Sequence, residues 1–241
     1  MNSITAAANA AWGLWRRDAA LLWPLFGVTQ FLPLLLRLLA MPPLPRLAGE
    51  AAGLVDQLRV LSAYGRENLP AILLIVVLQA LGRATLFSLY RAPARTLATA
   101  FGEALALFPR YLLIVLAVTL GTTFGLLLFL LPGFYLAGRW LLAGPAFVAA
   151  PERPSWGALA ASWRLTRGHG LLLMALVALA ELGRSLIERP FALGRASMAE
   201  APLLDALLAL GQATGGAAML LALALFQVGL YRELSARVTG A

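Results

Sequence analysis

The sequence predicts an all-α, polytopic transmembrane helix bundle of about six spans, formed as a single domain over residues 1–241. Of these residues 61% are hydrophobic and 12% are charged, against roughly 45–50% apolar and about 25% charged in a soluble domain. The mean hydropathy is +0.83. The apolar residues gather in runs of about 20, the number that a helix needs to cross a bilayer core of about 30 Å. These runs do not alternate as the strands of a membrane β-barrel do, so we expect membrane-spanning helices.

Six apolar runs are long enough to cross the membrane. The expected spans are 19–39, 69–89, 111–131, 134–150, 170–187 and 207–231. The third and fourth belong to one long uncharged run, which Pro132 and Gly133 divide. Because Pro-Gly is a turn signal, we expect a helical hairpin with its turn at these two residues.

Three short stretches, 5–17, 96–110 and 155–167, precede the first, third and fifth expected spans. Each is rich in Ala, contains aromatic residues and ends in Arg. This composition is typical of an amphipathic helix that lies in the membrane interface with its aromatic rings at headgroup depth. We therefore expect short interfacial helices before these spans. The alternative is that the stretches are helical cytoplasmic linkers.

Positive charge orients the chain. All 19 basic residues are arginines, the net charge is +8 and the pI is about 11.1. Fifteen arginines lie outside the expected spans, ten on the side of the two termini and five on the other side. The positive-inside rule then predicts a multi-pass membrane protein with both termini in the cytoplasm. The arginines are scattered singly between apolar runs, which favours the bilayer and its anionic lipids, rather than nucleic acid, as the partner.

A sequence signature resembles that of a known family. The run LPGFYLAGRW at 131–140 is followed by Pro145 and then by SWRLTRG at 162–168. This pattern resembles a bacterial family of six-span inner-membrane proteins, similar to the membrane domain fused to some glycerophosphodiester phosphodiesterases. The resemblance implies a membrane fold and a lipid-related role. It implies no phosphodiesterase activity, because no soluble stretch here is long enough to form that catalytic domain.

Three charged residues inside the expected spans form the candidate binding site. At 1.5 Å per helical residue, Arg139, Glu181 and Arg184 fall at the same depth. An isolated charge in lipid is costly unless it is paired, so we expect the three to be close together. Arg167 lies where the fifth span enters the membrane. The functional interpretation is an anion or lipid-headgroup site; the structural alternative is an ion pair that locks two spans together.

Small residues are expected at helix contacts. Gly121 with Gly125, and Gly211 with Gly215, form GxxxG pairs, which permit close helix packing within the bundle or between subunits.

Signals for catalysis are poor. The chain has one His and no Cys, so we expect no catalytic residues, no metal site and no cofactor. The expected function is that of a non-enzymatic membrane protein that binds lipid or a protein partner, with a role in membrane or envelope homeostasis. A membrane-protein partner or a homo-oligomer is compatible with this expectation. The alternative is a transporter of small molecules or lipids with a polar site near Arg139, Glu181 and Arg184.

Overall fold

The computed structural model describes residues 3–42, 53–92, 95–197 and 201–239, and every regular element among them is a helix. In chain order the elements are α1 (Ser3–Phe26), the π-helical turn η1 (Gly27–Phe31), α2 (Leu32–Ala40), α3 (Leu54–Glu67), α4 (Leu69–Leu89), α5 (Leu97–Leu128), α6 (Leu130–Arg139), α7 (Ala143–Ala149), α8 (Ser155–Leu165), α9 (Gly170–Ser197) and α10 (Pro202–Thr239). The all-α prediction is confirmed for this part of the chain.

Five helical segments of the described residues are long and apolar enough to cross a membrane. They are Ser3–Ala40, Leu69–Leu89, Leu97–Leu128, Gly170–Ser197 and Pro202–Val238. Each exceeds the roughly 20 residues that a bilayer core requires. The structure is therefore compatible with a multi-pass integral membrane protein.

Two of the three stretches expected as interfacial helices do not stand apart from the next span. Residues 5–17 are part of α1, which continues into η1 and α2, and residues 97–110 form the first part of the long helix α5. Ala favours helix, and neither stretch contains the Gly or Pro cluster that would end one. The third stretch does form a helix of its own, α8.

The expected span 134–150 is divided between two short helices. The chain reverses at Phe129, whose backbone is extended (φ −160°, ψ 149°), and α6 follows at once. The Pro-Gly pair expected in the turn, Pro132 and Gly133, lies inside α6. Proline is tolerated in the first turn of a helix and breaks one further in, and Pro132 and Pro145 are each the third residue of their helix, α6 and α7. Within the expected span 134–150, α6 therefore ends at Arg139 and a second helix, α7, begins at Ala143.

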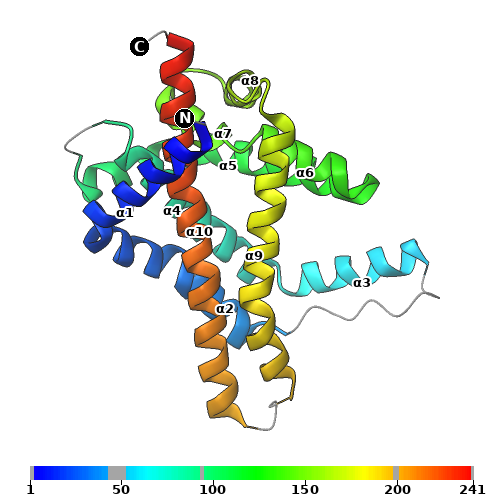
Figure 1. Cartoon of the computed structure of the whole chain (residues 1–241). Helices are drawn as coiled ribbons and strands as arrows, with labels where there is room; N and C mark the ends of the chain where they lie inside the picture. The colour runs from blue at the N-terminus through cyan, green and yellow to red at the C-terminus, as the bar shows by residue number, and fades with distance from the viewer. Residues whose placement is uncertain (1–2, 43–52, 93–94, 198–200, 240–241) are drawn as a thin grey trace.

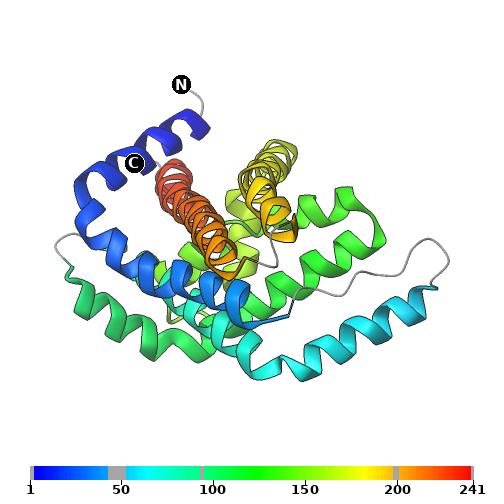
Figure 2. The same cartoon turned by 90° about the horizontal axis from the view of Figure 1, so that it is seen from below.

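The helix α10 is the centre of the packing. It contacts α1 and α9 along much of its length, and α6 packs against α9. The segment from α1 to α2 curves around one side of α10 (Figure 2). The start of α1 and the end of α10 lie at the same end of the molecule, and α6 runs across the direction of α9 and α10 rather than along it (Figure 1).

The four glycines expected at helix contacts all lie where a side chain would collide with a neighbour. A Cβ atom would lie 2.4 Å from the ring of Trp140 at Gly121, 2.8 Å from the Cα of Gly133 at Gly125, 2.4 Å from Phe191 at Gly211 and 2.5 Å from Ile187 at Gly215. All four contacts are within this chain. The first two hold the α5–α6 region together, and the last two hold α9 against α10.

Candidate functional site

Arg139 ends α6 and is buried, with 4% of its surface exposed. Its Nη1 donates a hydrogen bond to the carbonyl of Thr166 at 2.5 Å and its Nη2 to that of Trp163 at 2.7 Å. These carbonyls belong to the end of α8, where helical C=O groups lack intrahelical partners and carry partial negative charge. Arg139 therefore caps the C-terminus of α8.

The other residues of the sequence signature complete this junction. The hydroxyl of Ser162 donates to the carbonyl of Arg139 at 2.8 Å and accepts from the backbone N–H of Leu142 at 3.2 Å. The guanidinium of Arg139 lies over the ring of Trp163, 4.3 Å from its centroid. The signature thus joins the ends of α6, α7 and α8, and the group that it forms is structural.

Glu181 and Arg184 form a separate group on α9. The guanidinium of Arg184 pairs with Glu181 on one side, and its Nη1 lies 2.9 Å from Oε1 of Glu188 on the other. Glu188 was not among the expected site residues, although its spacing of four residues from Arg184 is that of a helical ion pair. These three residues follow one face of α9, where Arg184 is paired on both sides and the group carries one net negative charge.

The predicted cluster of Arg139, Glu181 and Arg184 is not formed. The Cδ of Arg139 lies 3.2 Å from the position of a Cβ at Gly170, the first residue of α9. Glu181 is eleven residues further along that helix, which is about 16 Å. The prediction was wrong because it measured the depth of Arg139 along a continuous span 134–150, whereas α6 stops at Arg139 beside the start of α9.

Arg167 is exposed in the turn between α8 and α9. The next residue, Gly168, has a φ of +81°, a left-handed conformation that glycine adopts easily and that commonly ends a helix. Arg167 does not line either of the two pockets described below.

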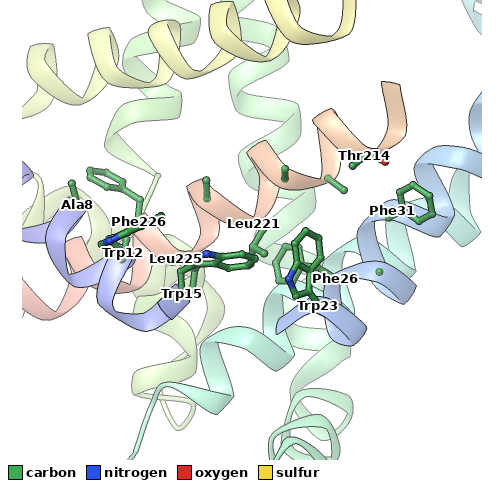
Figure 3. A pocket seen from close by; sticks show the side chains of 15 residues that line it. Ala8, Trp12, Trp15, Trp23, Phe26, Phe31, Thr214, Leu221, Leu225 and Phe226 are labelled. Carbon is green, nitrogen blue, oxygen red and sulfur yellow. The ribbon is translucent and has the colours of Figure 1, made fainter. Parts of the chain in front are cut away.

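An apolar pocket of about 650 Å³ lies between α1–η1 and α10. Most of its aromatic rings come from α1 and η1, and α10 forms the opposite wall with small or aliphatic residues and the ring of Phe226 (Figure 3). Leading members of the lining are Trp12, Trp15, Trp23, Phe26, Leu221 and Leu225. No charged side chain lines it, and Thr214 supplies its one hydroxyl group.

The sequence explains why this space stays open. Along α10 the lining residues include Ala217, Ala218 and Ala222, which are too short to fill the distance to α1. On the other wall, Trp15 and Trp23 stack edge to face with ring centroids 5.2 Å apart, which fixes both rings. The tryptophans at 12, 15 and 23 are the signal of this pocket in the sequence, although their pattern alone predicts only aromatic rings at the membrane interface for the first two.

Comparison of the chain with protein-family models, with curated proteins and with solved structures gave no match. Function is therefore inferred from the pockets and charges of this chain.

Proposed function

We propose that the chain is a non-enzymatic integral membrane protein that binds lipid, with an acyl chain held in the apolar pocket between α1 and α10. One observation carries this proposal: the pocket has a volume of about 650 Å³ and no charged lining. That volume falls within the range of about 300–1,000 Å³ typical of ligand sites. Burying a polar group without a hydrogen-bond partner is costly, so this lining favours an apolar ligand.

The position of the pocket favours a ligand that comes from the bilayer. Both walls belong to segments long and apolar enough to cross a membrane, Ser3–Ala40 and Pro202–Val238. Trp12 and Trp23 are 61% and 56% exposed, and tryptophan is enriched at membrane interfaces. A lipid of the surrounding membrane can enter such a pocket laterally, and its acyl chain stays in apolar surroundings as it does so.

The alternative function, transport, was expected to use one polar site built from Arg139, Glu181 and Arg184, and the structure does not form that site. Arg139 instead caps α8, while Glu181 and Arg184 pair on α9. Lipid binding is the function that the geometry favours.

We also propose that the protein lies in the bacterial inner membrane with both termini in the cytoplasm. The ratio of ten arginines to five supports this orientation. The location of the start of α1 and the end of α10 at one end of the molecule is compatible with an even number of crossings (Figure 1). The resemblance to the six-span family, carried by the signature at 131–140, Pro145 and 162–168, remains part of this proposal.

Native mass spectrometry of the full chain tests the proposed function through the phospholipids that remain bound after mild detergent extraction. Ala218→Phe and Ala222→Phe place rings inside the apolar pocket, and both alanines are exposed, so the larger side chains fill space without entering the core. We expect severalfold less bound lipid in either variant. Ala20→Phe is the control, since Ala20 is exposed on α1 and outside the pocket lining. Unchanged lipid retention in both pocket variants would contradict the proposal.

A further inference from the structure

A second pocket, of about 450 Å³, lies against a different face of α1. Three separate parts of the chain contribute its polar groups: α1, the connection from α4 to α5, and α10. These groups belong to Arg17, Asp18, Tyr90, Arg91, Arg95 and Arg232. Arg17 and Arg232 are 215 positions apart in the sequence, yet the fold brings them and the other two arginines to one concave surface. We call it the basic pocket.

The basic pocket carries more positive than negative charge. Four arginines line it, and Asp18 is the one carboxylate in its lining. Glu103 of α5, which is outside the lining, adds a second carboxylate: it pairs with Arg95, and its Oε2 lies 4.0 Å from Nη1 of Arg91. Two positive charges therefore remain in excess, on a surface that is partly shielded from water.

Tyr90 organises the base of this pocket. Its hydroxyl donates a hydrogen bond to Oδ2 of Asp18 at 2.8 Å, and its carbonyl accepts one from Nη2 of Arg232 at 2.7 Å. Asp18 in turn pairs with Arg17 at 2.9 Å. Burial, together with the hydrogen bond to Asp18, raises the pKa of Tyr90, so its hydroxyl stays protonated and continues to donate. The positions of Arg17 and Arg232 are thus set by contacts within the chain before any ligand arrives.

Arg91 is the guanidinium best placed to take a ligand. Its ion pair with Glu103 has the longest distance, 4.0 Å, of those formed by the pocket arginines among the described residues. One third of its side chain is exposed. Arg95 and Arg232 are held by shorter contacts, to Glu103 and to the carbonyl of Tyr90. Arg91 can therefore turn toward a bound anion at little cost to the fold.

The chemistry of the basic pocket matches a phosphate group. Guanidinium groups present paired N–H donors that fit two oxygens of a phosphate, and such charge-assisted hydrogen bonds are stronger than neutral ones. We propose that the basic pocket binds a phosphate group, supplied either by an anionic phospholipid headgroup or by a soluble phosphate compound. The apolar pocket takes no part in this inference, which stands or falls independently of the proposed function.

Two measurements on the full chain in nanodiscs distinguish the two sources. Calorimetric titration with inorganic phosphate, in nanodiscs of phosphatidylcholine alone, detects a soluble ligand. Native mass spectrometry after reconstitution with phosphatidylcholine and phosphatidylglycerol detects preferential retention of the anionic lipid. Phosphate binding in the first measurement assigns the pocket to a soluble compound. Selective retention of phosphatidylglycerol without phosphate binding assigns it to a headgroup.

The decisive variant is Arg91→Gln, which we expect to weaken whichever binding is seen by about tenfold, the factor that corresponds to one charged hydrogen bond. Arg91→Lys should give an intermediate loss, because lysine keeps the charge but not the paired donors. Arg17→Gln, at a side chain that is 67% exposed, provides a second test should Arg91→Gln fold poorly. Arg16→Gln removes the same charge from an exposed residue outside the pocket and is the matched control. The proposal is overturned if neither ligand binds, or if Arg16→Gln weakens binding as much as the pocket variants do.

Discussion

At the scale of single residues, Arg139 should matter more for stability than any other arginine considered above. Its guanidinium is buried, donates to two carbonyls at the end of α8 and stacks on Trp163. Arg139→Gln removes the charged donor that both carbonyls share and the guanidinium that stacks on Trp163, so we expect the free energy of unfolding to fall by about 3 kcal/mol. Arg139→Lys should recover only part of this, since an ammonium group cannot reproduce the planar fork. Denaturant unfolding in detergent micelles measures both.

A surface pair provides the comparison for Arg139. Arg237 pairs with Glu233 one turn away on α10, at 2.8 Å, and Arg237→Gln should cost only about 0.5 kcal/mol. Similar losses in the Arg139 and Arg237 variants would show that the junction of α6, α7 and α8 contributes little to stability.

The same residue shows what sequence can reveal and what it cannot. The signature singled out Arg139, Trp163 and Thr166, and these residues do meet. Their partners could not be deduced, because the hydrogen bonds run to backbone carbonyls, which every residue possesses and which no sequence pattern marks. The prediction that Arg139 pairs with Glu181 came from counting depth along an assumed continuous span. In the structure Arg139 lies beside Gly170, and Glu181 is about 16 Å further along α9.

At the scale of helices, the close contact between α1 and α10 depends on Gly229. A Cβ atom there would lie 2.6 Å from the carbonyl oxygen of Ala7 and 3.3 Å from the Cβ of Ala10. Because the nearer atom is backbone, relief requires α1 to move as a whole. We expect Gly229→Ala to lower the free energy of unfolding by about 1–3 kcal/mol and to reduce lipid retention, since α1 forms one wall of the apolar pocket.

The control for this contact lies on α1 itself. A Cβ at Gly13 meets nothing within 4 Å, so Gly13→Ala should raise stability by about 0.5–1 kcal/mol through helix propensity alone. A loss of stability in Gly13→Ala as large as that in Gly229→Ala would mean that backbone flexibility, not the close approach of α1 and α10, is what these glycines provide.

Helix existence was predicted better than helix boundaries, for physical reasons. Long apolar runs such as 69–89 predict helices because lipid requires every backbone group to be paired internally, and α4 spans those residues. Boundaries within 111–150 depend on where the two prolines of that segment, Pro132 and Pro145, fall relative to the helix starts. The sequence favoured a break at Pro132, whereas the structure breaks at Phe129 and keeps Pro132 in the first turn of α6. Hydropathy does not distinguish these two outcomes.

At the scale of the whole molecule, the hairpin of α5 and α6 decides how the membrane is crossed. With ten residues, α6 is about 15 Å long, half of a bilayer core. It runs across the direction of α9 and α10 (Figures 1 and 2). A Cβ atom at Gly138, near its end, would lie 2.7 Å from the backbone nitrogen of Met174, within the first turns of α9. The hairpin therefore lies beside one end of α9 and does not run parallel to α9 along its whole length.

The tip of that hairpin is suited to hydrocarbon. Residues 126–131 contain no polar side chain, and Leu127, Phe129, Leu130 and Leu131 are each about two-thirds to three-quarters exposed. Because a large exposed apolar surface is unfavourable in water, we expect the tip to stay within the membrane rather than to emerge on the outer side. Four segments, Ser3–Ala40, α4, α9 and α10, would then cross completely, an even number that keeps both termini on one side.

Cysteine labelling tests this arrangement without interference, because the natural chain has no cysteine. Phe129→Cys should resist a membrane-impermeant maleimide applied to intact cells and to inverted vesicles alike, since the tip lies in lipid. Arg59→Cys, at a side chain that is 77% exposed on α3, should be labelled in intact cells, and Arg164→Cys, exposed on α8, only in inverted vesicles. Labelling of Phe129→Cys in intact cells would mean that α5 crosses completely and that the chain returns through α6 and α7. The six-span arrangement would then be correct. The direction of α6 across α9 and α10 would in that case mean that the hairpin crosses the membrane at a tilt, not that its tip ends within the lipid.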